Sequence, residues 1–361
     1  MRLPSLAMLL TLIPCIVYAG ESSAYIYTME TVFANQGTES FTFEEYDLGL
    51  PAFWDSSTCT VALINCSHPF TVELDVDGNP VYMPEFPATL EAGETETLKA
   101  TYRIDSRPRS RPGYDAGEAG TLEGVPGELA AKYCRPTETY ASDGPRVAAL
   151  AETLTASPTV MGKVLKVLDW FMANTTYRGS EAPRPAEETA ATRAGDCDDL
   201  TILFVSICRA AGIPAYMQVG AVFIEGYSVA EATWGGHLVY EAESVAWHAW
   251  AMAYIPPWGW TPVDLTLTES LTPIDMITEA PYWRAESLPA YNVSDGGFIH
   301  DETWQRDRLM GGGVTVTSRN VAVRMEEESP ERRLPSLWVP LAAAGFLALY
   351  LIHKHGRGLR L

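Results

Sequence analysis

Residues 195–214 read GDCDDLTILFVSICRAAGIP and combine a reactive residue type with a clear helical pattern. Gly195 permits a sharp turn and Asp196 is a good N-cap, so we expect a helix that begins at Cys197. Apolar residues then recur at helical spacing until a glycine and a proline end the pattern. The stretch therefore predicts a buried helix with a thiol on its first turn.

The start of a helix changes the chemistry of a cysteine. The partial positive charge of the unpaired N–H groups favours a thiolate, and the same groups can hold an oxyanion. Asp198 and Asp199 act in the opposite direction by raising the thiol pKa, so activation of Cys197 requires a cationic histidine. Cys208 lies about 16 Å farther along the helix axis, too far for a disulfide with Cys197. Cys197 is thus a candidate free nucleophile.

A histidine and an aspartate follow on two predicted strands. His248 lies in an alternating run, WHAWAMAY at 247–254, and Asp264 ends the run WTPVD at 260–264. A cysteine at a helix end, a histidine on a strand and an aspartate on the next strand form a set of nucleophile, base and orienter. His237 is a competing base, but it lacks an acid at a useful distance on a neighbouring strand.

The pairing of these two strands decides whether the set can form. If Ile255 paired with Trp260, the side chains of Asp264 and His248 would point to opposite faces of the sheet. We therefore predict an odd loop, such as one that pairs Tyr254 with Trp260 across residues 255–259, or a bulge with the same effect. This register places the aspartate within reach of the histidine ring.

Three motifs in this order form a specific pattern. The sequence has G-D-C-x-D followed by L-F-x-x-x-C-R-A-A-G-I-P, then H-A-W at 248–250, then W-x-P-V-D at 260–264. The pattern resembles the microbial, protease-like branch of the transglutaminase-like superfamily, over roughly residues 130–275. The resemblance implies a papain-like core and acyl transfer from amides, with Cys197 as nucleophile, His248 as base and Asp264 as orienter. We expect no cofactor and no metal.

The predicted fold class is α+β, with an N-terminal β-sandwich module, a papain-like α+β domain and one C-terminal transmembrane helix. Short alternating runs between turn signals predict the sandwich. Helical patterns before strands predict the α+β domain. The predicted divisions are a β-sandwich module at 20–105, a linker at 106–126, a transglutaminase-like domain at 127–292 and an extension with a stalk at 293–333.

The two ends of the chain predict a location at a membrane. Residues 1–19 have the layout of a secretory signal peptide, with Arg2, an apolar run and a small residue at the end. Residues 334–352 contain no charge and would span about 28 Å as a helix, close to the thickness of the hydrocarbon layer. Residues 353–361 would form a cytoplasmic tail. We expect a single-pass membrane protein with its main body outside the cytoplasm.

The composition is globular, with 47% hydrophobic and 20% charged residues. The net charge of −21 repels phosphates, so we expect no nucleic acid partner. The expected partner is a protein or peptide substrate, and the oligomeric state stays open.

Five cysteines belong to the expected exported part. Cys197 and Cys208 are predicted to be unbridged, so any disulfide would use Cys59, Cys66 or Cys134. A single strand would hold Cys59 and Cys66 about 23 Å apart, which makes Cys134 the better partner for one of them.

Three functions fit the residues. The first is a membrane-anchored, extracytoplasmic amidase, peptidase or acyltransferase that acts through a thioester on Cys197. The second is a catalytically inactive envelope scaffold or binding module that uses the same cleft. The third is a protein-cross-linking transglutaminase.

Overall fold

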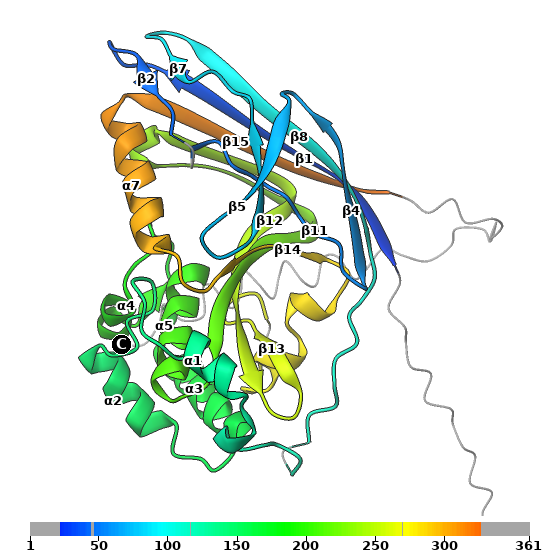
Figure 1. Ribbon diagram of the computed structural model, residues 1–361, viewed down its shortest axis with the longest axis vertical. Helices are drawn as coiled ribbons and strands as arrows, with labels where there is room; N and C mark the ends of the chain where they lie inside the picture. Colours follow the sequence, from blue (N-terminus) through cyan, green and yellow to red (C-terminus); the bar gives the residue numbers. More distant parts are fainter. Residues whose placement is uncertain (1–21, 45–46, 116, 269, 326–361) are drawn as a thin grey trace, which may run out of the picture. The chain divides into compact units, whose positions relative to one another are not determined.

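Alternating apolar residues build long strands that pair into one large sheet. The structure is a computed structural model that describes residues 22–44, 47–115, 117–268 and 270–325. Within these residues the sheet has eight strands, in the order β14-β11-β12-β15-β1-β8-β4, and β13 pairs with β12 (Figure 1). Their bounds are β1 (Ser23–Asn35), β4 (Cys59–Cys66), β8 (Thr95–Ser106), β11 (Ala215–Thr233), β12 (Leu238–Ile255), β13 (Gly259–Val263), β14 (Ser287–Val293) and β15 (Val314–Met325).

Shorter strands and the helices complete the described chain. The short strands are β2 (Phe41–Thr42), β3 (Leu50–Pro51), β5 (Phe70–Leu74), β6 (Pro80–Pro84), β7 (Thr89–Leu90), β9 (Thr176–Tyr177) and β10 (Ala194–Gly195). The α-helices are α1 (Gly127–Tyr133), α2 (Pro145–Leu154), α3 (Val160–Asn174), α4 (Ala186–Thr192), α5 (Cys197–Ala210), α6 (Asp275–Thr278) and α7 (Phe298–Gly311). Single 3-10 turns are η2 (Leu122–Gly124), η3 (Trp234–Gly236) and η4 (Pro281–Trp283).

The fold is mixed α/β, and the predicted α+β class with an N-terminal β-sandwich module is wrong. The N-terminal strands β1, β8 and β4 belong to the same sheet as β11, β12 and β14. The connection is β15, which pairs antiparallel with β1 and parallel with β12. Alternation predicted the strands, but it carries no information on a partner that lies about 300 residues away, as in the pair Ala24 and Met325.

The transmembrane helix in the predicted fold class is also not supported. Among the described residues, no helix is both long enough and apolar enough to cross a bilayer. The segment 334–352 on which the prediction was based lies outside the described residues, as does the predicted signal peptide at 1–19.

Helix α5 is the centre of the helical layer and matches its prediction. It begins at Cys197 and ends at Ala210, and Gly212 follows with a left-handed φ of 75°. Residues 199–209 are buried, and the helix packs on β12 and β11 with α2, α3 and α4 around it (Figure 1). This burial on all sides holds the helix start in a fixed place relative to the sheet.

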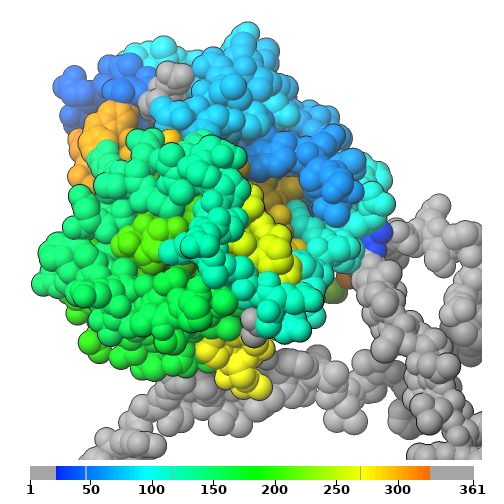
Figure 2. All heavy atoms as spheres, turned by 60° about the horizontal axis from the view of Figure 1, so that its bottom comes forward, coloured from blue at the N-terminus to red at the C-terminus, as the bar shows by residue number. Residues whose placement is uncertain are grey.

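Residues 106–126 run across the surface beside the segment that follows β12 (Figure 2). The backbone N–H of Arg109 donates to the carbonyl of Trp283 at 3.0 Å, and the N–H of Gly120 donates to that of Pro256 at 2.8 Å. A side chain on Gly120 would collide with Pro256, at 2.7 Å from its Cβ. The segment is therefore fixed to the rest of the protein at Arg109 and at Gly120.

The predicted register between β12 and β13 is confirmed. Tyr254 pairs with Trp260, and the ladder continues to Ala251 and Val263, one residue before Asp264. On the same edge of β12, β15 pairs only with residues 238–243. The stretch that contains His248 therefore lies between these two ladders.

Each described cysteine is free. The prediction that Cys197 and Cys208 are unbridged is confirmed. Cys59 and Cys66 lie at the two ends of the single strand β4, as predicted.

Candidate active site

Cys197 is the first residue of α5 and is partly exposed. Its side chain packs against the main apolar core, which fixes its direction, and its sulfur lies close enough to the ring of His248 to raise the pKa of the imidazole. The unpaired N–H groups at the helix start contribute a partial positive charge beside the thiol. Solvent access, a fixed position and a ring partner are the features that a nucleophilic cysteine requires.

The imidazole of His248 connects the thiol to Asp264. Its Nε2 lies 2.8 Å from Oδ2 of Asp264, so Nδ1 is the ring nitrogen left for Cys197. The ring is buried, with 5% of the residue exposed, and lies 6.0 Å from the ring of Trp250. The structure thus brings the three predicted site residues together.

Asp264 is held by the backbone of the turn that follows β13. Its Oδ1 accepts the N–H groups of Thr266 at 2.9 Å and Leu267 at 2.8 Å, which leaves Oδ2 to face His248. Burial opposes ionisation, but the charge and hydrogen bond of His248 outweigh it and lower the pKa of Asp264. The aspartate is therefore a fixed anion.

His248 is the positive partner between two groups that can carry negative charge. Burial lowers its pKa, but the Asp264 carboxylate and the Cys197 sulfur outweigh this effect and raise the pKa to about 10. The ring therefore favours an imidazolium at neutral pH. An imidazolium next to the sulfur is the partner that a thiolate needs.

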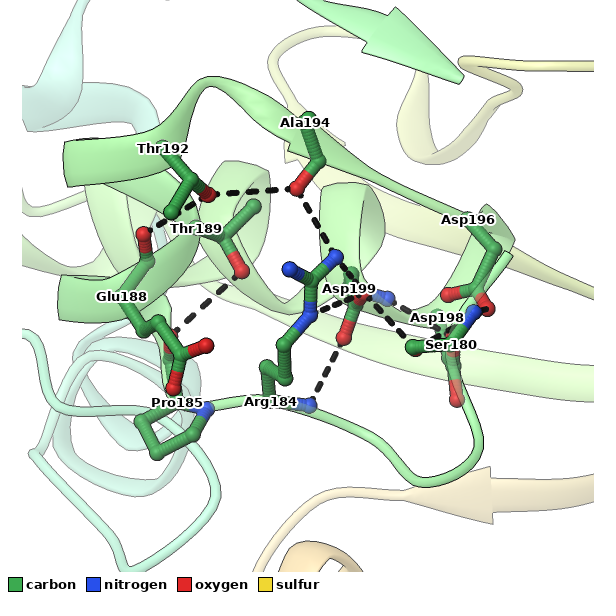
Figure 3. Close-up of polar contacts among 10 residues, drawn as sticks. All are labelled: Ser180, Arg184, Pro185, Glu188, Thr189, Thr192, Ala194, Asp196, Asp198 and Asp199. Carbon is green, nitrogen blue, oxygen red and sulfur yellow. Dashed lines mark hydrogen bonds and ion pairs between the residues drawn. The ribbon is translucent and has the colours of Figure 1, made fainter. Parts of the chain in front are cut away.

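Three carboxylates surround the start of α5 (Figure 3). The carboxylate of Asp196 does not cap the helix but accepts the backbone N–H of Ser180 at 2.9 Å and its hydroxyl at 3.1 Å. Asp199 is fully buried and accepts the N–H and the Nε of Arg184 at 2.7 and 2.9 Å. These bonds hold the loop that precedes α4 against the start of α5, where the nucleophile lies.

Asp198 follows the nucleophile in the chain. Its pKa is raised, whereas the pKa of Asp196 is lowered. Burial is the largest cause that raises the pKa of Asp198 to about 10, and hydrogen bonding to Asp196 and the charge of Cys197 add to it. For Asp196, hydrogen bonds from Asp198 and Ser180 outweigh burial and lower the pKa. Asp196 and Asp198 therefore share a single proton at neutral pH.

Among the described side chains, those of Asp196, Asp198 and Asp199 are spaced closely enough to hold a metal ion. Their carboxylate oxygens lie within 4.8 Å of one another. Arg184 already supplies a positive charge to Asp199. A metal ion at this position would have to displace both that cation and the shared proton.

The comparison with protein families identifies the region that holds these residues. The family model of the Transglutaminase-like superfamily matches residues 148–265, which include Cys197, His248 and Asp264. Residues 148–265 form a transglutaminase-like domain. The resemblance noted in the sequence motifs is thereby confirmed. No curated protein sequence matches the chain.

The similarity to solved structures extends beyond residues 148–265. A protein from Cytophaga hutchinsonii, provisionally described as a cysteine protease, has a TM-score of 0.51 at 16% identity, over 89% of this chain and 95% of that one. The periplasmic domain of TgpA from Pseudomonas aeruginosa has a TM-score of 0.32 at 17% identity, over 71% of this chain and 92% of that one. Red sea bream transglutaminase has a TM-score of 0.25 at 13% identity, over 68% of this chain and 48% of that one. The first likeness shows a shared, cysteine-protease-like fold.

Sequence reasoning missed the residues that support the nucleophile of the transglutaminase-like domain. Ser180 and Arg184 lie in a loop without periodicity, so no pattern assigned them to the start of α5. Tyr177, which is 67% exposed, lies within electrostatic range of Cys197 because β9 pairs with β10. The rival base His237 instead places its Nδ1 2.9 Å from the carbonyl of Val314.

The buried pair of Arg184 and Asp199 predicts a large effect on stability. Asp199→Ala would remove the counter-charge of the Arg184 guanidinium and the acceptor of the Arg184 backbone N–H, so we expect a loss of roughly 3 to 5 kcal/mol in the free energy of unfolding. Urea denaturation measures this loss in the free energy of unfolding. The matched control is Asp105→Ala, which breaks the exposed pair with Arg103 and should cost less than about 1 kcal/mol. Equal losses in the two variants would contradict this assignment.

The shared proton predicts a small effect at Asp198. Asp198→Asn replaces a protonated carboxyl by an amide, so the pH midpoint of Cys197 alkylation should stay within about 0.5 unit of the wild type. If Asp198 were ionised, the same substitution would remove a negative charge beside the sulfur and lower that midpoint by about one unit or more. Alkylation rates measured between pH 4 and 10 distinguish the two results.

Proposed function

We propose that the protein is a cysteine-dependent hydrolase or acyltransferase that acts on peptide amides through a thioester on Cys197. The observation that carries the proposal is the continuous line of contacts from the sulfur through the His248 ring to Asp264. The transglutaminase-like, cysteine-protease-like fold supports the same class of chemistry.

The first half of the proposed reaction forms the thioester. The Cys197 thiolate attacks the carbonyl carbon of the amide, and the N–H groups at the start of α5 stabilise the negative oxygen that develops. The imidazolium of His248 then gives its proton to the departing nitrogen, and the C–N bond breaks. Free amine and acylated Cys197 result.

The second half of the reaction releases the acyl group and restores the free Cys197 thiolate. Neutral His248 takes a proton from water or from an acceptor amine, which attacks the thioester, and the thiolate leaves. Asp264 orients the ring and stabilises its charged form through the bond to Nε2. Water as acceptor gives hydrolysis, and an amine gives transfer or cross-linking.

The proposed location is outside the cytoplasm. It rests on the signal peptide predicted at residues 1–19, which lie outside the described residues. Incubation of cells with a thiol reagent that does not cross membranes tests it, with Cys197 labelling as the readout. Labelling only after cell lysis would contradict this location.

A covalent intermediate tests the proposed activity directly. A mixed peptide library is incubated with the protein, the reaction is stopped with acid, and mass spectrometry maps acyl groups on cysteine. We expect acylation at Cys197 and a peptide product with a new carboxyl end. Addition of a fluorescent amine distinguishes transfer from hydrolysis. Intact peptides and an unmodified Cys197 would favour the inactive scaffold.

A further inference from the structure

A cavity of about 620 Å³ lies beside the pair of His248 and Asp264. One of its lining residues is Leu267, whose backbone N–H binds the Asp264 carboxylate at 2.8 Å. Another is Val222, which is two residues along β11 from Gly220, the residue that pairs with His248. Two residues on one face of a strand span about 7 Å, so this wall of the cavity lies one side-chain repeat along β11 from the position opposite His248.

The inner wall of the cavity is apolar except for one carboxylate. Val222, Phe223 and Ala322 line it and are each less than 5% exposed. Glu286 also lines it, and its Oε2 is buried without a hydrogen-bond partner among the described residues. A buried acceptor without a donor is costly, so this wall favours an occupant that donates a hydrogen bond.

Three glutamates and two arginines line the cavity, which gives the lining a formal net charge of −1. Glu225 and Glu243 line the same cavity as Glu286. Within the described part of the chain, none of these three glutamates forms an ion pair. The two lining arginines have other acceptors: Arg284 donates to the carbonyl of Glu279, and Arg324 donates to the Ser23 hydroxyl. Three carboxylates thus remain available to a ligand.

We propose that this cavity binds the basic side chain of a peptide substrate, with the Glu286 carboxylate as its counter-charge. The apolar wall suits the methylene stem of a lysine, and the carboxylate suits its ammonium. The inference rests on the proposed function, because it places the basic residue close to the amide that Cys197 attacks. It makes the protein selective for peptides with a positive charge near the cleaved bond.

Paired peptides test the selectivity. A lysine and its uncharged analogue norleucine are placed in turn at each of the positions around the cleaved amide, and kcat/KM is measured for each pair. At one position we expect the wild type to prefer lysine by roughly 10- to 100-fold, the range for a charged hydrogen bond. Glu286→Gln, which keeps the shape of the side chain, should remove the preference by lowering kcat/KM for the lysine peptide.

Glu243→Gln is the matched control, because it removes an exposed carboxylate from the same cavity. Its effect on the preference should be less than about threefold. The proposal is overturned if the wild type has no preference at any position or if Glu286→Gln retains it. Equal thermal unfolding of wild type and Glu286→Gln shows that the variant is folded, and Glu286→Ala repeats the test with the carboxylate removed.

Binding without turnover separates this proposal from the proposed function. In the Cys197→Ala variant, calorimetry should show tighter binding of the lysine peptide than of the norleucine peptide, and adding Glu286→Gln should remove the difference. If this holds while the wild type cleaves neither peptide, the cavity assignment stands and the proposed function fails. If the wild type cleaves both peptides and the variant binds them equally, the function stands and the cavity assignment fails.

Discussion

Cys197→Ala should abolish turnover of every peptide and every covalent capture of an electrophilic peptide probe at the active site. The reason is that the substitution removes the atom that carries the acyl group, so no other residue at the site can form the thioester. The partial exposure of Cys197 and the interaction of its sulfur with His248 make it the nucleophile in the proposed reaction. Mass spectrometry after probe treatment measures capture, and peptide release measures turnover.

Cys208→Ala is the control for this experiment. Cys208 lies on the same helix, is fully buried and has a pKa that burial raises. It should not react with the probe, and its removal should leave capture at Cys197 unchanged. Turnover that persists in Cys197→Ala would show that another group performs the reaction.

His248→Ala should lower kcat/KM by roughly 10⁴- to 10⁶-fold, because proton transfer and the cationic partner of the thiolate are lost together. The ring contributes both, since Nε2 binds Asp264 and the other nitrogen faces Cys197. The value of kcat/KM is measured from peptide cleavage at pH 7. Because the substitution also leaves the buried Asp264 carboxylate without its cation, His248→Gln is measured beside it as a variant that refills the space.

Asp264→Ala should retain more activity than His248→Ala. The aspartate does not touch the substrate in the proposed reaction but fixes the ring, so its loss should cost roughly 10²- to 10⁴-fold by comparison with other triads. Equal activity of wild type and Asp264→Ala would contradict its orienting role. Circular dichroism of each variant verifies that the protein is folded.

The features that were predictable from sequence are local. The start of α5 at Cys197 follows from a turn residue, a capping residue and helical spacing within a few positions. The pairing of Tyr254 with Trp260 follows from two neighbouring strands and the faces that their side chains must share. In both cases the partners are close in the chain, so spacing alone restricts the geometry.

The features that were missed depend on distant partners. The strand β15 pairs with β1, and this long-range pairing replaces the predicted sandwich by one continuous sheet. The bonds of Arg184 to Asp199 and the position of Glu286 in a cavity depend on how loops without periodicity cross the surface. Spacing along a chain does not encode such contacts, because loops of the same length follow many paths.

The pH dependence of iodoacetamide labelling at Cys197 tests the central claim, that an ion pair with His248 activates the thiol. The pKa of His248 is raised to about 10, so its ring stays protonated from pH 5 to 9, and an ion pair with the thiolate would keep the labelling rate of the wild type nearly constant across this range. In His248→Ala the rate should fall about tenfold for each pH unit below the thiol pKa, near 8.5 for an ordinary cysteine. The same pH profile for wild type and His248→Ala would contradict the ion pair and with it the proposed catalytic site.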